Sequence, residues 1–290
     1  MRGVASDYLT LTKPPIISLL LITATGGMFL AAEGVPPLQT LAMVLVGGTL
    51  GAGGANAINH FLDQDIDAMM SRTVKRPVAS NRIAPMSALA FGIALNVGAF
   101  FVLAYWVNLL AASLTLAATL FYILVYTGWL KRNTPQNIVI GGAAGAILPM
   151  VRWAAVTGGL ELPALYLFSI VFFWTPPHFW ALALLIQKDY EKAGVPMLPV
   201  VSGVAHTKRH ILGYSLVLFA TALAPALLGF ASLFYGVCAA LLGGCFLVAA
   251  LRVLRHEGDR PARQMFGFSI LYLFMIFAIL IVDKSLGLAG

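Results

Sequence analysis

Polar residues at regular spacing close an otherwise apolar stretch of the chain: Asn59, Asp63, Asp65 and Asp67. On a helix, Asn59, Asp63 and Asp67 stack on one face, with about 40° of drift at each step of four residues, whereas Asp65 points elsewhere. Carboxylates at the edge of an apolar segment are costly unless they are paired or bind a cation. Mg²⁺ prefers such oxygen ligands and usually combines one or two carboxylates with substrate phosphates. We therefore predict that Asn59, Asp63 and Asp67 hold Mg²⁺ and a diphosphate.

Basic residues are predicted at the same level as this acidic group. Arg72, Lys75 and Arg76 follow it directly, and Lys131 and Arg132 close a later apolar stretch. Cations around a metal-bound diphosphate would neutralise the leaving group as its C–O bond breaks. The alternative is a solvated helix end whose aspartates simply pair with these cations. From the residues alone, both interpretations stay open.

A second acidic group lies far along the chain. Asp189 and Glu191, with Lys188 beside them, follow the apolar stretch that contains Pro176 and Pro177. Two adjacent prolines remove two backbone donors and predict a kink or a break in that helix. A broken helix inside a bilayer is tolerated where it lines a cavity. The pattern predicts a second polar edge at the same membrane level as the first.

Two histidines also lie within apolar stretches. His178 directly follows the proline pair, and His60 lies beside the predicted aspartate face. An intramembrane histidine could bind haem iron, carry a proton or form a structural hydrogen bond. The residues do not choose among these roles.

The chain as a whole is too apolar for a water-soluble domain. Of its 290 residues, 60% are hydrophobic and 10% are charged, and the mean hydropathy is +0.90. Soluble domains have about 25% charged residues, so we expect an all-α integral membrane protein. In a soluble protein the net charge of +7 would suggest nucleic acid. Here basic loops explain the charge, and no nucleic-acid partner is expected.

Nine apolar stretches are long enough to cross a bilayer, which takes about 20 residues. They cover residues 15–32, 39–60, 86–106, 109–130, 137–158, 163–186, 210–231, 233–254 and 265–284. Residues 1–290 are therefore predicted to form one membrane domain. All but two of the 18 Lys and Arg residues fall on one side, which predicts a cytoplasmic N-terminus and an external C-terminus. We find no signal or transit peptide pattern and expect the bacterial inner membrane.

Four pieces of the sequence together resemble a known family. They run from Asp63 to Pro77, from Tyr126 to Gly142, from Pro176 to Ala181 and from Lys188 to Val200. The pattern of Asn59, Asp63 and Asp67 resembles the UbiA-type membrane prenyltransferases. The later pieces resemble, more narrowly, the branch that farnesylates haem. The resemblance covers nearly the whole chain and implies a UbiA-type bundle of nine transmembrane helices.

This resemblance implies a reaction and a role for each residue. A farnesyl group would pass from farnesyl diphosphate to a vinyl group of haem B, and water would complete the addition to give haem O. Asn59, Asp63 and Asp67 would hold Mg²⁺, and Asp189 would be what survives of a second acidic motif. The cations that would grip the diphosphate are Arg72, Lys75, Arg76, Lys131, Arg132 and Lys188. Membrane lipid would surround the enzyme, and haem A synthase or terminal oxidase assembly would take up the product.

The sequence departs from the family pattern at two places. The wider family has aspartates four apart in its second motif, where this chain has Asp189 and Glu191, and this argues against a second full metal site. Near residues 148–152 the branch often has two prolines and a glycine, whereas this chain has Arg152 near the middle of a predicted span. Arg152 would pair with a haem propionate or a carboxylate, or snorkel toward the interface. With His178 and His60, it is a candidate haem contact.

Parts of the sequence are also compatible with two other functions. A UbiA-type enzyme could use another aromatic acceptor, although the segments beginning at Pro176 and Lys188 argue against it. An ion-coupled transporter also has broken helices and intramembrane charges. Its polar groups would lie near the midplane, however, whereas these carboxylates are predicted at one membrane edge.

Overall fold

The chain is helical throughout the part described by the structure, a computed structural model of residues 3–287 that omits the side chains at 15, 16, 18–20 and 22–24. No β-strand occurs within residues 3–287. The long helices are α2 (Pro14–Ala31), α3 (Leu38–Leu62), α5 (Pro85–Trp106), α6 (Leu109–Leu120), α9 (Ala143–Thr157), α10 (Leu162–Leu185), α13 (Val204–Leu227), α14 (Leu233–Arg255) and α15 (Asp259–Ser285). The shorter elements are α1 (Val4–Thr12), α4 (Gln64–Met69), the π-helix η1 (Phe121–Leu130), α7 (Lys131–Asn133), α8 (Asn137–Gly141), α11 (Gln187–Lys192) and α12 (Leu198–Val201).

These helices form a membrane-spanning bundle. Eight helical stretches among the described residues are long and apolar enough to cross a bilayer, and α2 coincides with the first predicted span. Large apolar side chains such as Tyr105, Leu124 and Leu241 are exposed, as expected where lipid replaces water around a protein. The prediction of an all-α integral membrane protein is confirmed.

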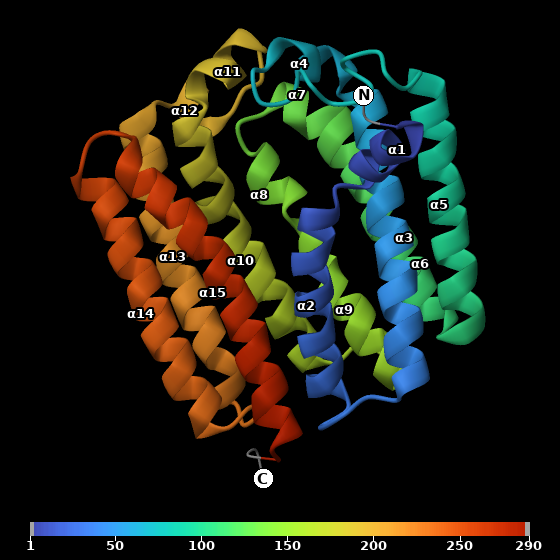
Figure 1. The fold of residues 1–290 in the computed structure, drawn as a ribbon. Helices are drawn as coiled ribbons and strands as arrows, with labels where there is room; N and C mark the ends of the chain where they lie inside the picture. Colours follow the sequence, from blue (N-terminus) through green and yellow to red (C-terminus); the bar gives the residue numbers. More distant parts are fainter. Residues whose placement is uncertain (1–2, 288–290) are drawn as a thin grey trace.

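The short helices α1, α4, α7, α11 and α12 gather at one end of the bundle, the upper end in Figure 1. We call this the loop-rich end. The largest buried cluster, which includes Trp180 and Tyr272, joins α10, α13, α14 and α15. A smaller cluster around Val44, Leu103 and Val151 joins α3, α5 and α9. These two clusters fix the long helices, and the long helices in turn hold the polar groups of the loop-rich end in place.

Two long helices end in the same way at the loop-rich end. α3 gives way at Asp63 to the six-residue α4, and α10 gives way at Ile186 to the six-residue α11. The two short helices belong to one buried cluster, which includes Ile66 of α4 and Tyr190 of α11. Acidic segments that are far apart in the sequence therefore lie close together in space.

The sequence predicted a kink or a break at Pro176 and Pro177, and the break is wrong. α10 runs unbroken through both prolines, because its packing against α9, α13 and α15 outweighs the loss of two N–H donors. The irregular backbone lies elsewhere. Gly142 separates α8 from α9, and η1 has the wider winding of a π-helix, which is frequent at functional sites.

Candidate active site

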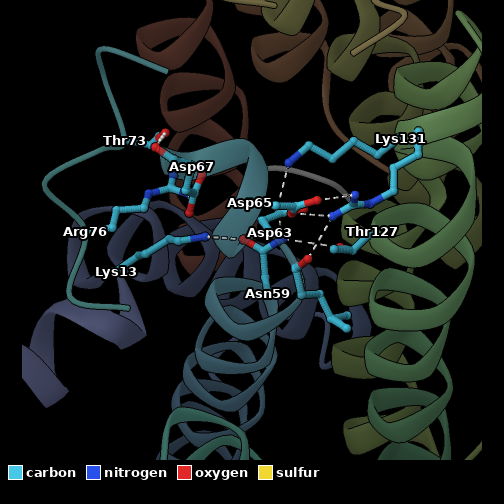
Figure 2. Close-up of polar contacts among 11 residues, drawn as sticks. Lys13, Asn59, Asp63, Asp65, Asp67, Thr73, Arg76, Thr127 and Lys131 are labelled. Atoms are coloured by element: carbon cyan, nitrogen blue, oxygen red, sulfur yellow. Dashed lines mark hydrogen bonds and ion pairs between the residues drawn. The ribbon is translucent and has the colours of Figure 1, made fainter. Parts of the chain in front are cut away.

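Asn59, Asp63 and Asp67 are buried at the loop-rich end, with exposed fractions of 4%, 1% and 2% (Figure 2). The Asn59 amide nitrogen donates to Asp63 Oδ2 at 2.6 Å and to Thr127 Oγ1 of η1 at 3.3 Å. The Asp67 N–H donates to the Asp63 carbonyl at 2.8 Å across the junction of α3 and α4. The predicted ladder is therefore interrupted at Asp63, where α3 ends and a new helix begins.

Both buried carboxylates are paired with cations from other segments. Lys131 Nζ of α7 lies 2.5 Å from Asp63 Oδ2. Arg76 Nη1, in the loop after α4, lies 2.7 Å from Asp67 Oδ2. Removing either cation would leave an uncompensated buried charge, which typically costs about 3–5 kcal/mol. Two predicted diphosphate cations are thus placed at the predicted metal ligands, and Figure 2 shows them converging there.

A third cation, Lys13, completes the cluster. Lys13 connects α1 to α2, and its Nζ donates to Asn59 Oδ1 at 2.9 Å. Burial, followed by the charge of nearby Arg76, lowers the pKa of Lys13 to about 7. Lys13 therefore adds a partly desolvated donor to the side of the cluster opposite Lys131.

Asp65 points away from the cluster, as predicted. Its side chain is 55% exposed, and Arg132 Nη1 lies 2.7 Å from its Oδ2. The hydrogen bond from Arg132 lowers the pKa of Asp65 to about 2. Arg132 also donates to the Leu62 carbonyl at 2.8 Å. It therefore caps the end of α3, and its predicted role as a diphosphate ligand stays a prediction.

The oxygens of the cluster fit a divalent cation. Asp63 Oδ1 is buried and has no hydrogen-bond partner among the described residues, and Mg²⁺ binds hard anionic oxygens of this kind. Within residues 3–287, no group of three or more His, Cys, Asp or Glu side chains could hold a metal by itself. A metal held by Asp63, Asp67 and Asn59 would therefore need further ligands, which a diphosphate could supply.

Asp189 has a different environment from the first acidic group. Its Oδ2 accepts hydrogen bonds from the Ser71 N–H at 3.1 Å and from Ser71 Oγ at 2.5 Å. These bonds fasten α11 to the loop that contains Arg72, Lys75 and Arg76. The contact between Asp189 and Ser71 therefore helps to position this loop and its three cations.

Three other predicted diphosphate cations, Arg72, Lys75 and Lys188, have exposed side chains that form no ion pair within the described part of the chain. Lys188 and Asp189 line a cleft of roughly 580 Å³ between the end of α10, α11, α13 and the start of α15. Their role with diphosphate stays a prediction, as does that of Glu191, which is also exposed.

The two candidate histidines lie in different surroundings. The His178 ring stacks between Trp174 at 4.3 Å and Phe266 at 4.8 Å, and its Nδ1 lies 2.7 Å from Ser269 Oγ. The buried His60 has no hydrogen-bond partner for either ring nitrogen among the described residues. The contacts of His178 are those of a structural histidine, and neither residue joins the acidic cluster through a hydrogen bond.

Arg152, the third candidate haem contact, lies inside the bundle on α9. It is 2% exposed, and its Nη1 donates to the Leu148 carbonyl at 2.9 Å. Among the described residues, its Nε has no hydrogen-bond partner and no carboxylate forms an ion pair with it. It does not snorkel to an interface.

The model of the UbiA prenyltransferase family matches residues 20–277. The chain belongs to this family. Solved structures support the same fold for this UbiA prenyltransferase. One, described as digeranylgeranylglyceryl phosphate synthase, has a TM-score of 0.80 at 17% identity and covers 97% of this chain and 98% of its own. Another, a UbiA homologue from Archaeoglobus fulgidus bound to DMAPP and Mg²⁺, has a TM-score of 0.65 at 17% identity, covering 94% and 99%.

More similar relatives of this UbiA prenyltransferase have a more specific name. A protoheme IX farnesyltransferase of Parvibaculum lavamentivorans is 49% identical over 99% of this chain and 92% of its own length. Another, of Roseiflexus sp. (strain RS-1), is 51% identical over 96% of this chain but only 52% of its own length. The chain thus spans about half the length of some relatives and about nine tenths of others.

Sequence reasoning missed three residues of the site: Lys13, Ser71 and Thr127. Lys13 stands directly before Pro14 at the start of the first span, and its charge was explained by membrane topology alone. A basic residue at the same edge as the aspartates was the available signal. Thr127 and Ser71 gave no signal, because their contacts depend on how η1 and α11 pack against α3 and α4.

Proposed function

We propose that this UbiA prenyltransferase transfers the farnesyl group of farnesyl diphosphate to a vinyl group of haem B, and that water completes the addition to give haem O. Identity of 49% and 50% to proteins named protoheme IX farnesyltransferase, over nearly the full length of both chains, supports these substrates. The observation that carries the site assignment is the buried set of Asn59, Asp63 and Asp67, each facing a cation at one end of an apolar bundle.

Binding of the diphosphate would exchange the partners within the cluster. Lys131 and Arg76 pair with Asp63 and Asp67, and diphosphate oxygens would draw both cations toward themselves through charge-assisted hydrogen bonds. The carboxylates would then hold Mg²⁺, with the unpartnered Asp63 Oδ1 among the ligands. Bound Mg²⁺ supplies positive charge that stabilises the leaving diphosphate.

The reaction itself needs no protein nucleophile. The C–O bond of farnesyl diphosphate breaks, and both electrons leave with the diphosphate. The π electrons of the haem vinyl group then form a bond to the terminal carbon of the farnesyl cation. Water adds to the new cation beside the porphyrin ring and loses a proton. The protein contributes positioning and charge neutralisation, which are the main sources of catalysis in reactions of this kind.

The same proposal places the loop-rich end in the cytoplasm of a bacterial cell. The basic residues lie predominantly at this end of the spans, which favours an N-terminus inside and a C-terminus outside the inner membrane. Farnesyl diphosphate would reach the acidic cluster from the cytoplasm, and haem would enter from the lipid. Haem A synthase or terminal oxidase assembly would use the product.

An assay with the purified full-length protein in lipid nanodiscs tests this proposal. With farnesyl diphosphate, haem B and Mg²⁺, we expect haem O, identified by mass spectrometry, and no product after EDTA treatment. Prenylation of a phenolic acid or a chlorin, with none of haem B, would overturn the choice of acceptor. Turnover that is unaffected by EDTA would overturn the metal assignment.

A further inference from the structure

Arg152 has an environment that the acidic cluster does not explain. Its side chain is 98% buried in the membrane part of the bundle, and its Nε has no hydrogen-bond partner among the described residues. The ion pairs of the described chain all lie near the loop-rich end and none includes Arg152. An intramembrane cation is expensive to keep, and such residues usually face a cavity and pair with an anion.

The guanidinium of Arg152 lies against one face of α3. A Cβ added to Gly48 would stand 3.0 Å from Arg152 Nη2. Gly48 and Asn59 are eleven residues apart, which is three helical turns or about 16 Å, and so they share one face of α3. Between them on that face lie only small residues, Ala52 and Ala55. A strip of small residues therefore runs along α3 from the acidic cluster to Arg152.

The side of α9 that precedes Arg152 also carries a small residue. Gly145 precedes Arg152 by two turns on the same face of α9, on the side of the loop-rich end, and no atom of the described neighbouring residues lies within 4 Å of the place where its Cβ would be. Gly48 and Ala52 are only half-buried, although Arg152 of α9 faces this side of α3. Small residues therefore line both α3 and α9 between the diphosphate site and the Arg152 guanidinium.

We propose that Arg152 binds a carboxylate of the acceptor, a propionate of the porphyrin, at the far end of this strip of small residues. This inference rests on the proposed function. The reaction brings two kinds of anion to the protein, and the diphosphate belongs to the acidic cluster about 16 Å away. Haem has its reacting vinyl group and its propionates at opposite edges of a flat ring. A vinyl group held beside the diphosphate therefore directs the propionates toward Arg152.

A comparison of haem B with its dimethyl ester tests this site. The full-length protein in nanodiscs is titrated with each porphyrin by absorbance, without farnesyl diphosphate, and then assayed for KM. We expect the wild type to bind the diacid at least about tenfold more tightly than the ester. In Arg152→Met this preference should fall to about one, with KM for farnesyl diphosphate unchanged. Arg152→Lys should restore part of the preference.

Arg255→Met is the matched control, because Arg255 is an exposed arginine at the end of α14, and its preference should equal that of the wild type. Equal losses of diacid and ester binding in Arg152→Met would overturn the carboxylate site and indicate a packing role. Unchanged diacid binding, or a shift in Arg152→Gly toward longer prenyl chains without a change in porphyrin binding, would overturn it too. The binding titration needs no turnover, so a wild type that binds the diacid selectively but transfers no farnesyl group would contradict the proposed function alone.

Discussion

The two acidic segments at the loop-rich end share a backbone design but differ in what they bury. Each follows a long helix and a break of one residue, at Asp63 in one and at Ile186 in the other. With the breaks aligned, Asp67 corresponds to Tyr190, and both are buried. Asp65 corresponds to Lys188, and both are exposed. The same geometry thus presents carboxylates to the interior in the first segment and an apolar junction with a tyrosine in the second.

The position of an acidic residue relative to the break therefore decides whether its carboxylate faces the interior, and the mere presence of the residue in the segment does not. Asp189 lies one place before the buried position and turns to Ser71. Its oxygens thus fasten the loop of the first segment. We infer that the first segment provides the metal and diphosphate ligands, and that the second positions the cations of the first. Whether a second metal binds near Asp189 and Glu191 is a question for the Mg²⁺ titration of Asp189→Asn.

The largest expected effect is at Asp63. Asp63→Asn keeps the size of the side chain but removes the charge that pairs with Lys131 and the anionic Oδ1. We expect kcat for farnesyl transfer to fall by about 100-fold or more, as for the loss of one strong transition-state stabiliser. Glu191→Gln, in the second segment, should change kcat less than about twofold. Comparable losses in both variants would contradict the division of roles between the segments.

Lys131 should show the next largest effect, mainly in binding. Lys131→Met removes a charged donor to the diphosphate, so KM for farnesyl diphosphate should rise by about 10- to 100-fold. It also leaves Asp63 unpaired, which should lower the thermal stability. The double variant with Asp63→Asn should regain stability but not activity. Lys188→Met, in the second segment, is the matched control, and a rise in KM of similar size there would contradict the comparison.

Composition and the length of the apolar stretches were sufficient to predict the helical membrane bundle, and the position of the two acidic segments predicted that they lie at the same membrane edge. The spacing of Asn59, Asp63 and Asp67 predicted a shared face, and the outward direction of Asp65 is confirmed. The interruption at Asp63 could not be predicted, because no glycine or proline marks it. The proline pair at 176–177 had the opposite outcome, since neighbouring helices support α10 where local propensity favoured a break.

The partners within the site were less predictable than its residues. The charge pattern predicted cations near the aspartates, but it did not predict which cation pairs with which aspartate. Arg132 pairs with exposed Asp65, whereas Lys131, its neighbour in sequence, pairs with buried Asp63. Which of two adjacent cations faces inward depends on the winding of η1 just before them. That winding is a property of the packed bundle and leaves no pattern in the residue types.

Asp189 should have a moderate effect that is indirect. Asp189→Asn weakens the bonds to Ser71, and a net loss of about 1 kcal/mol would change kcat/KM by about fivefold. Ser71→Ala should cause a loss of similar size, and the double variant should be little worse than either single one, because both remove the same contact. The Mg²⁺ concentration for half-maximal activity should stay unchanged. A raised Mg²⁺ requirement in Asp189→Asn would instead make Asp189 a metal ligand.

The smallest effect is expected at Asp65, although it lies between the two most important carboxylates. Its pair with Arg132 is partly exposed on both sides, at 55% and 35%, and exposed pairs typically contribute only about 0–1 kcal/mol. Asp65→Asn should therefore change kcat and KM by less than about threefold and shift the melting temperature only slightly. Arg132 would keep its bond to the Leu62 carbonyl. A loss near that of Asp63→Asn would show that Asp65 turns inward during catalysis. Burial in the resting protein would then not distinguish the carboxylates that act in catalysis from those that only support the structure.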